Sequence, residues 1–212
     1  MERRSGTSLL IHLLHWPILA LGPGKRLGLW VQGCSIHCEG CISRATWPFD
    51  EKRAVGVRKL LRKIARVFET EHLDGLTVSG GEPFDQGEAF PAFLKGLRKL
   101  GINDVLVFSG YKHDDLLARY PEIPELLTTL VDSPFELGNE TDAAWKGSGN
   151  QTMTLFRPEY QDRYSRWAAA KKGGLQIVSD AEIVAVAGIP YQRDVPGIKE
   201  KIANHIIFLH SR

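Results

Sequence analysis

The chain is predicted to be an α/β protein with a parallel sheet, because short apolar runs alternate with longer segments of helical periodicity. Turns rich in glycine, serine or proline directly follow several of the apolar runs. No internal repeat and no clear linker divides the sequence. Such strand–helix alternation is typical of a parallel sheet with right-handed crossovers, so we expect one domain over residues 1–212.

Four strands and three helices are expected in the first part of the chain. The strands are short apolar runs at residues 27–31, 73–78, 104–108 and 129–131. The helices are expected near residues 55–69, 86–100 and 114–120. Gly101 stands where a C-terminal cap would close the second helix, and Pro121 and Pro124 break the third.

The pattern loosens after Pro134. Residues 135–150 are rich in Gly, Asn, Thr and Asp and are expected to form a long loop. The later elements are expected as a strand at 151–156, a helix at 163–172 stopped by two glycines, a β-hairpin at 175–178 and 182–186, a short helix near 198–203 and an apolar run at 206–209.

The composition is that of an ordinary soluble protein. With 212 residues, of which 43% are hydrophobic and 25% charged, the chain can bury a sizeable core. The formal net charge of +2 gives no sign of a nucleic-acid partner, because an electrostatic footprint needs a clustered basic face. The basic residues between 58 and 66 fit the solvated side of an amphipathic helix.

The N-terminal residues superficially resemble a signal peptide, since two arginines precede an apolar stretch at residues 9–21. His12, His15 and Pro17 interrupt this stretch, and no clear cleavage site follows it. The stretch is also too short and too polar to span a bilayer. We therefore expect a mature segment of a cytoplasmic protein that has no membrane partner.

The three cysteines of the chain, Cys34, Cys38 and Cys41, lie within eight residues in a C-x3-C-x2-C pattern. Three thiolates from one loop can hold three corners of a cubane iron–sulfur cluster, and the fourth iron is then left open. An odd cysteine count argues against a disulfide framework. A zinc site with His37 as fourth ligand is the main alternative.

Unusual residues also follow the other predicted strands. A Gly-Gly-Glu turn at 80–82 follows the second strand, Ser109 and Tyr111 follow the third, and Asp132 follows the fourth. The carboxyl ends of parallel strands face the active site in α/β architectures. Four separate segments, including the cysteine loop, therefore direct their chemistry to one rim of the predicted sheet.

The cysteine loop and the residues before it resemble a known family. The Gly-Pro-Gly-x-Arg segment at 22–26 and the Gln-Gly-Cys entry at 32–34 are similar to pyruvate formate-lyase activating enzymes. The Cys-x3-Cys-x-Gly-Cys ending at 34–41 is similar to the activating protein of anaerobic ribonucleotide reductase. Both are glycyl-radical-enzyme activases of the radical S-adenosylmethionine (SAM) superfamily.

Two later stretches resemble the same family. Residues 79–83 are similar to its Gly-Gly-Glu motif, and residues 147–151 are similar to its Gly-Ser-Ser-Asn-Gln stretch. Gly149 stands in place of the second serine, and Thr152 stands where a basic residue is common. The resemblance covers residues 22–155, the expected core of a single radical SAM domain, with an extension at 156–212.

The resemblance implies an incomplete (β/α)6-type TIM barrel, followed by the C-terminal hairpin and short helix. It implies a [4Fe–4S] cluster on Cys34, Cys38 and Cys41, with SAM chelating the open iron. An electron from a flavodoxin- or ferredoxin-type donor would cleave SAM to a 5′-deoxyadenosyl radical. In an activase, that radical abstracts a hydrogen atom from a glycine of a partner glycyl radical enzyme.

The resemblance also implies roles for residues on the rim, each beside a plainer interpretation. Gly80 and Gly81 would let the backbone approach SAM, or they make an ordinary tight turn. Glu82 would lie beside the SAM ammonium group, or it is a charge at a helix N-terminus. Asp132 would contact SAM or cap a turn, and Ser109 would line the same rim.

Two further sets are less specific. Ser148, Asn150 and Gln151 resemble a stretch near SAM in the family, although any polar loop would look the same. Lys25 and Arg26 would hold the cluster loop or the SAM carboxylate, or they are surface charges.

Three functions follow, led by an activase of a glycyl radical enzyme. The second is a radical SAM enzyme that modifies a peptide or a small metabolite, such as a deazapurine precursor. An activase needs a docking surface and a small-molecule enzyme needs a closed pocket, and the extension at 156–212 could supply either one. The third, a zinc-binding interaction module, would leave the Gly-Gly-Glu turn unexplained.

Overall fold

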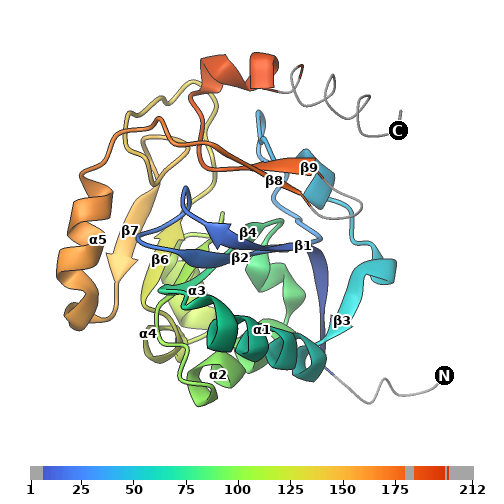
Figure 1. The fold of residues 1–212 in the computed structure, drawn as a ribbon. Helices are drawn as coiled ribbons and strands as arrows, with labels where there is room; N and C mark the ends of the chain where they lie inside the picture. Colours follow the sequence, from blue (N-terminus) through green and yellow to red (C-terminus); the bar gives the residue numbers. More distant parts are fainter. Residues whose placement is uncertain (1–6, 180–183, 199, 201–212) are drawn as a thin grey trace, which may run out of the picture.

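A computed structural model of the chain describes residues 7–179, 184–198 and 200. These residues form a seven-stranded sheet in the order β3-β1-β2-β4-β5-β6-β7 and a separate β8–β9 ribbon (Figure 1). The strands are β1 (Ser8–Ile18), β2 (Arg26–Val31), β3 (Ala54–Gly56), β4 (Gly75–Gly80), β5 (Val105–Phe108), β6 (Thr129–Asp132), β7 (Thr152–Leu155), β8 (Gln176–Ser179) and β9 (Val184–Ala187). The helices are α1 (Val57–Glu71), α2 (Ala89–Lys99), α3 (His113–Arg119), α4 (Ile123–Leu126) and α5 (Gln161–Ala168).

The centre of the large sheet is parallel. β2, β4, β5 and β6 pair in parallel, with Leu27 opposite Leu76 and Val107 opposite Leu130. β1, β3 and β7 run antiparallel to their neighbours. The prediction of an α/β chain with a largely parallel sheet is confirmed, and the sheet is open, with β3 and β7 as its edges.

Different parts of the chain cover the two faces of this sheet. Residues of α1 to α4 pack in the large core that contains Leu29 of β2. On the opposite face, Trp30 of β2 lies in a cluster with Val178 of β8, and Leu106 of β5 lies in a cluster with Tyr164 of α5. Figure 1 shows the same arrangement, with α1 and α2 on one side of β2 and β4 and the β8–β9 ribbon on the other. The C-terminal extension therefore covers the face that α1–α4 leave free, because successive strand residues point to opposite faces.

The predicted helix at 55–69 is present as α1, shifted by two residues at each end. Residues 54–56 pair with β1 as the short strand β3, so the helix begins only at Val57. Its buried side chains, at a spacing of three or four residues, are Val57, Leu60, Ile64 and Val67. The basic residues between 58 and 66 are exposed, which confirms that they form a solvated helix face.

Residues 27–31 do form a buried strand, β2, but the prediction that it is the first strand of the core is wrong. β1 precedes that strand and pairs antiparallel with it, so the apolar stretch at 9–21 is largely part of the sheet. Leu9, Leu13 and Ile18 are almost wholly buried. Register shifts in the pairing of β1 with β2 interrupt the strict alternation of the strand. Alternation of apolar and polar residues is the sequence signal for a strand, so β1 could not be predicted from its pattern.

Several other boundaries differ from the prediction. The segment expected as one helix at 86–100 begins with a 3-10 turn at Pro83–Gln86, and α2 follows from Ala89. Gly101 follows α2 with a φ of 76°, as expected of a C-terminal cap. Pro124 lies in the first turn of the short helix α4, where a missing N–H costs nothing, rather than breaking a helix. α5 begins two residues before the predicted helix at 163–172 and ends at Ala168.

The C-terminal predictions are confirmed where the structure describes them. The strand expected at 151–156 is β7, although it runs antiparallel to β6. The expected hairpin is the antiparallel pair β8–β9, and residues 180–183 of that prediction lie outside the described residues. The short helix near 198–203 and the apolar run at 206–209 also lie almost wholly outside them. Within the described part of the chain, no helix is both long and apolar enough to cross a membrane.

Candidate cluster and cofactor site

The three cysteines lie in a loop that leaves β2 at its carboxyl end and folds back on itself. The N–H of Gly33 donates to the carbonyl of Thr46 at 2.7 Å, and the N–H of Cys34 donates to the carbonyl of Trp47 at 3.0 Å. A further backbone hydrogen bond of 3.2 Å joins Cys41 to Cys38. All three thiols are free and partly buried. The loop therefore presents three thiols from a short, internally bonded segment.

These thiols open onto one cavity of about 400 Å³. The predicted site residues that line it are Cys34, Cys38, Cys41, Gly80, Gly81, Glu82, Ser109 and Gln151. Their segments follow β2, β4 and β5 and precede β7. The structure therefore brings the cysteine loop and the Gly-Gly-Glu turn together, as the order of the elements predicts.

The surroundings of the thiols suit sulfur bound to iron. Burial raises the pKa of the Cys34 thiol, and the N–H groups of Ile36 and His37 partly offset this by bonding its sulfur. Burial likewise raises the pKa of Cys38, whose sulfur accepts from the N–H of Phe135. Such N–H···S contacts stabilise the thiolate form and tune iron–sulfur clusters. Burial thus disfavours the ionised form of Cys34 and Cys38, and a bound metal would stabilise it.

The described residues contain no group of three His, Cys, Asp or Glu side chains placed to hold a single metal ion. A cubane cluster makes a different demand, because each of its cysteine ligands binds a separate iron atom. Three thiols that share one cavity without converging on one point fit that demand.

The Gly-Gly-Glu turn is joined directly to the cysteine loop. The N–H of Gly81 donates to the carbonyl of Val31 at 2.9 Å, and the N–H of Glu82 donates to the carbonyl of Gly33 at 2.8 Å. Gly80 has a φ of 102°, and a Cβ there would lie 2.7 Å from the backbone of Val31. A Cβ on Gly81 would overlap the carbonyl oxygen of Gly33. Both glycines are thus required by the close approach of two backbones at the cavity wall.

Glu82 is a buried carboxylate surrounded by neutral donors. Its Oε1 accepts from the N–H of Phe84 at 3.0 Å and from the hydroxyl of Ser109 at 2.9 Å, and its Oε2 accepts from the N–H of Gly110 at 2.8 Å. The residue is 1% exposed, and burial raises its pKa to about 7, although these hydrogen bonds lower it. A carboxylate has about four lone-pair sites, so one on Oε2 remains for a further donor from the cavity. Glu82 therefore caps a turn, as one interpretation held, and also faces the cavity.

Asp132, Ser148 and Asn150 do not line the cavity. Asp132 is buried and accepts hydroxyl hydrogen bonds from Ser133 at 2.9 Å and Thr152 at 2.7 Å. Ser148 accepts from the N–H of Glu136. These contacts tie the end of β6 to the start of β7 and close the loop between them.

Gln151 is the member of the 147–151 stretch that both lines the cavity and shapes its wall. Its Oε1 accepts from the N–H of Gly147 at 2.7 Å, and its Nε2 donates to the carbonyl of Ser133 at 3.1 Å. Asn150 donates in the same direction, from Nδ2 to the carbonyl of Pro134 at 2.8 Å. The two amides therefore fold the long loop back onto the carboxyl end of β6.

Tyr111 and Asp85 hold the cysteine loop from outside the cavity. The Tyr111 hydroxyl donates to Asp85 Oδ1 at 2.7 Å and contacts the Ser35 hydroxyl at 3.1 Å. Asp85 Oδ2 accepts from the N–H of Ser35 at 2.6 Å. Tyr111 was expected on the rim, whereas Asp85 was not foreseen. Its position three residues after Glu82 was the only sequence signal that could have found it.

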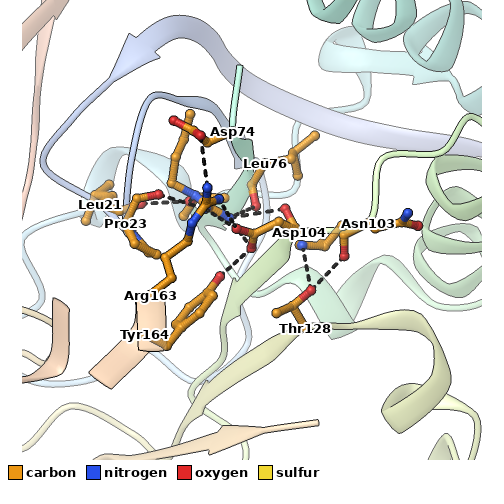
Figure 2. Close-up of polar contacts among 12 residues, drawn as sticks. Leu21, Pro23, Asp74, Leu76, Asn103, Asp104, Thr128, Arg163 and Tyr164 are labelled. Atoms are coloured by element: carbon orange, nitrogen blue, oxygen red, sulfur yellow. Dashed lines mark hydrogen bonds and ion pairs between the residues drawn. The ribbon is translucent and has the colours of Figure 1, made fainter. Parts of the chain in front are cut away.

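Neither Lys25 nor Arg26 lines the cavity, and Lys25 is a half-exposed charge, as the plainer of its two interpretations expects. Lys25 donates to the carbonyl of Glu71 at 2.7 Å, outside the cavity. Arg26 opens β2 at its amino end and is fully buried, with both terminal nitrogens 3.1 Å from the carboxylate of Asp104. Figure 2 shows Asp104 at the centre of this network, with Tyr164 and Arg163 reaching it from α5. Arg26 is therefore neither a cofactor ligand nor a surface charge.

The cavity residues that come from the extension were not predicted from the sequence. Val186, Gly188, Ile189, Pro190, Gln192, Val195 and Pro196 all line the cavity that holds the cysteines. They are small, apolar or amide residues without a recognisable motif, and only the packing of β8–β9 on the sheet brings them there. The sequence predicts that the extension supplies either a docking surface or a pocket wall, and it does not decide between the two.

An iron–sulfur site formed at the carboxyl end of β2 defines the class of protein. The chain belongs to the family of 4Fe–4S single cluster domains, whose model matches residues 20–154. Among its curated relatives is the anaerobic ribonucleoside-triphosphate reductase-activating protein of Salmonella typhimurium, 30% identical over 68% of this chain and 97% of the relative. The proteins of the same name from Escherichia coli K12 and phage T4 are 29% and 27% identical, over 68% and 62% of this chain and 97% and 85% of theirs. These relatives confirm the predicted resemblance to activating proteins of this kind.

Proposed function

We propose that the chain is a radical SAM enzyme that activates a glycyl radical enzyme. The observation that carries this proposal is the single cavity that holds all three cysteines together with the Gly-Gly-Glu turn. Cys34, Cys38 and Cys41 would bind three irons of a [4Fe–4S] cluster. When bound, the reduced cluster and SAM together supply a 5′-deoxyadenosyl radical, the species that removes a hydrogen atom from the substrate.

The residues around the cysteines suit a zwitterionic cofactor. Glu82 offers a buried carboxylate with one free lone-pair site and no cation among its hydrogen-bond partners, which suits the SAM ammonium group. The backbone of Gly80 and Gly81 is open to the cavity because neither residue carries a side chain. Ser109 holds Glu82 in place, and Gln151 holds the opposing loop. The role of these residues is to bind and orient the cofactor and to exclude water, rather than to act as acids or bases.

Asp132, Ser148 and Asn150 would contribute to the same site through the loop that they brace. None of them lines the cavity, so we assign them the positioning of Gln151 and of the carboxyl end of β6. This refines the expectation that they contact SAM directly.

The exposed apolar side chains at the opening of the cavity suit a protein substrate. Ile42 and Leu137 both line the cavity, and they are 40% and 54% exposed, respectively. Exposed apolar side chains at the rim of a site are typical of surfaces that meet a partner. Three relatives are named as activating proteins of an anaerobic ribonucleoside-triphosphate reductase. We infer a partner of that class, whose glycine enters at this rim.

The remaining expectations fit this function. An open, largely parallel sheet with the site at the carboxyl ends of its strands supports an incomplete (β/α)6-type barrel, with residues 1–212 as one domain. A cluster of this kind needs a reduced environment and a one-electron donor, for which we propose the cytoplasm and a flavodoxin or ferredoxin.

One observation favours a second candidate. The extension contributes a wall to the cavity, so the site is more enclosed than an open sheet edge would be. An enclosed site suits a radical SAM enzyme that acts on a small metabolite or a short peptide.

Anaerobic reconstitution tests the proposal. The reconstituted chain is reduced with dithionite and given SAM, and 5′-deoxyadenosine is quantified by chromatography. We expect product with the wild-type chain, background levels with Cys38→Ala, and unchanged product with Glu39→Ala, which alters an exposed residue of the same loop. A chain that holds a cluster and still forms no deoxyadenosine would refute SAM chemistry.

The partner is tested separately by electron paramagnetic resonance. We expect a glycyl radical signal when the active chain is mixed with an anaerobic ribonucleotide reductase from the same organism. Deoxyadenosine formation without this signal would favour the small-substrate candidate.

A further inference from the structure

The chain continues well beyond the part that it shares with its family. The matched region ends at residue 154, and α5, β8, β9 and residues 188–198 follow it. The Salmonella typhimurium relative is covered over 97% of its own length but matches only 68% of this chain. The extension is therefore an addition to the shared domain, and its position shows what it adds.

The β8–β9 ribbon is packed firmly on the face of the sheet where the cavity lies. Val178 and Ala187 are almost wholly buried in a cluster with Leu13, Ile18 and Trp30. Trp30 also lines the cavity. The ribbon therefore buries apolar surface next to the cluster site, which makes it part of the core.

Gln176, the first residue of β8, anchors the extension to the end of β1. Its Oε1 accepts from the N–H of Leu19 at 3.0 Å, and its Nε2 donates to the carbonyl of Pro17 at 2.6 Å. Both partners lie at or just beyond the end of β1. The side-chain amide of Gln176 thus makes two hydrogen bonds with the backbone, which fix its orientation as well as its position.

Gln192 fixes the other end to the long loop between β6 and β7. Its Oε1 accepts from the N–H of Gly138 at 2.9 Å, and its Nε2 lies 3.4 Å from the carbonyl of Glu136. These partners flank Leu137, which lines the cavity at its rim. The extension therefore runs from the end of β1 to the 135–150 loop, and it is held at both places.

Between these two anchors, residues at the end of β9 and just after it line the cavity. Gly188 has a φ of 121°, and a Cβ there would lie 2.7 Å from the carbonyl oxygen of Gly174. This glycine turns the chain sharply after β9. The next residues, Ile189 and Pro190, line the cavity together with Val186.

We propose that residues 186–196, which the packed β8–β9 ribbon holds in place, are a specificity-determining wall of the cluster cavity. The inference rests on the proposed function, and it assigns the extension a role in that site. The wall lines one side of the cavity with mostly apolar side chains, so a substrate group enters at the exposed rim where Ile42 and Leu137 lie. A partner must then present its glycine on a narrow, extended segment of chain, because a bulky surface cannot reach the cavity floor.

Thiol chemistry of the full chain tests the wall without a cluster or SAM. The chain has only three cysteines, and all of them line the cavity. Cys34 also borders a second hollow beside Trp47 and Phe49, so the labelling of Cys38 and Cys41 is the readout for this site. The reaction rate of the cluster-free chain is measured with a bulky maleimide dye and with the small reagent iodoacetamide. The ratio of the two rates measures access through the wall, independently of the intrinsic reactivity of the thiols.

Two variants change the wall in opposite directions. Gln192→Ala removes the anchor on the 135–150 loop and is expected to raise the bulky-to-small ratio by about two- to tenfold, the change produced by one net hydrogen bond. Ile189→Trp adds volume at the cavity and is expected to lower the ratio. Gln161→Ala is the matched control, because it removes an exposed hydrogen bond on α5 and should leave the ratio unchanged.

The results separate this inference from the proposed function. The inference would be overturned if the ratio were the same in all four proteins. It would also be overturned if both rates rose equally in Gln192→Ala. Failure of the wild-type chain to form deoxyadenosine would refute the proposed function and leave the thiol result valid. In an active chain, Gln192→Ala is further expected to form more deoxyadenosine per glycyl radical, because hydrogen-atom donors from solution reach the cavity.

Discussion

Two buried carboxylates lie at opposite ends of the parallel strands, and they differ in what surrounds them. Asp104 precedes β5 and faces two arginines and a tyrosine, of which Arg26 makes a two-pronged contact at 3.1 Å. Glu82 follows β4 and accepts hydrogen bonds from a serine hydroxyl and two backbone N–H groups. Both acids are at most 3% exposed.

The difference shows how the same chemical group serves a structural role in one place and a binding role in another. Asp104 has its counter-charge within the chain, so it needs nothing from outside. It also receives Arg163 and Tyr164 from α5, so the network joins the extension to the amino end of the sheet (Figure 2). Among the described residues no cation is a hydrogen-bond partner of Glu82, and burial makes its ionised form costly, as its raised pKa reflects. A cationic group of a ligand would complete the site.

The largest expected effect is at the amino end. Asp104→Asn leaves Arg26 buried without a counter-charge, so we expect the free energy of unfolding to fall by about 3–5 kcal/mol. Urea denaturation of the cluster-free chain measures this. Asp74→Asn, which breaks the half-exposed ion pair of Asp74 with Arg163, is the control and should cost less than about 1 kcal/mol. Equal losses of unfolding free energy in the two variants would show that the buried ion pair is no more important to stability than the half-exposed one.

The next effect is a pH dependence at the carboxyl end. The pKa of Glu82 is about 7 in the folded chain against an ordinary value of 4.5. Between these values the unfolded chain releases the proton while the folded chain keeps it, so stability falls as the pH rises from 4.5 to 7. The fall amounts to about 3 kcal/mol at most.

Glu82→Gln removes this titration. We expect its free energy of unfolding to lack that contribution to the fall between pH 4.5 and 7, as measured by denaturation at a series of pH values. Asp85 is a nearby carboxylate that raises the pKa of Glu82 and remains in the variant, so the comparison isolates Glu82. A parallel pH profile in wild type and variant would contradict the raised pKa.

A smaller change in free energy is expected for cofactor affinity. Loss of a hydrogen bond to a charged group costs about 1.5–3 kcal/mol, so Glu82→Gln should weaken SAM binding by about ten- to a hundredfold. Calorimetric titration of the reconstituted chain measures the affinity. Glu88→Gln, the same change at an exposed carboxylate six residues away, should bind SAM as the wild type does. Equal affinity in all three proteins would remove Glu82 from the site.

The smallest effect concerns the neutral donors around Glu82. Ser109→Ala removes the hydroxyl that bonds Oε1 at 2.9 Å, which should destabilise the fold by about 1 kcal/mol. The ionised form loses a donor, so the pKa of Glu82 should rise further and the pH-dependent fall should extend to higher pH. Ser165→Ala, whose hydroxyl makes an exposed bond to Gln161, serves as the control and should do neither.

Part of the candidate site and most of the elements that carry it could be predicted from the sequence. The cysteines, the Gly-Gly-Glu turn, Ser109 and Gln151 all reach one cavity, because each follows or precedes a strand with a clear apolar pattern. β1 was missed because its register shifts disturb the alternation that marks a strand. Arg26 was misread because its position beside a glycine-rich turn says nothing about the carboxylate 78 residues away that pairs with it.

The sequence by itself determined the chemistry of the protein and the order of its elements. Three cysteines at a fixed spacing define the cluster loop, and local apolar patterns define most strands and helices. Only the tertiary structure decided which charges are paired and which side chains wall the cavity. The reason is physical: burial and counter-charges depend on neighbours brought from distant positions, as the 78 residues between Arg26 and Asp104 and the 54 between Gly138 and Gln192 show.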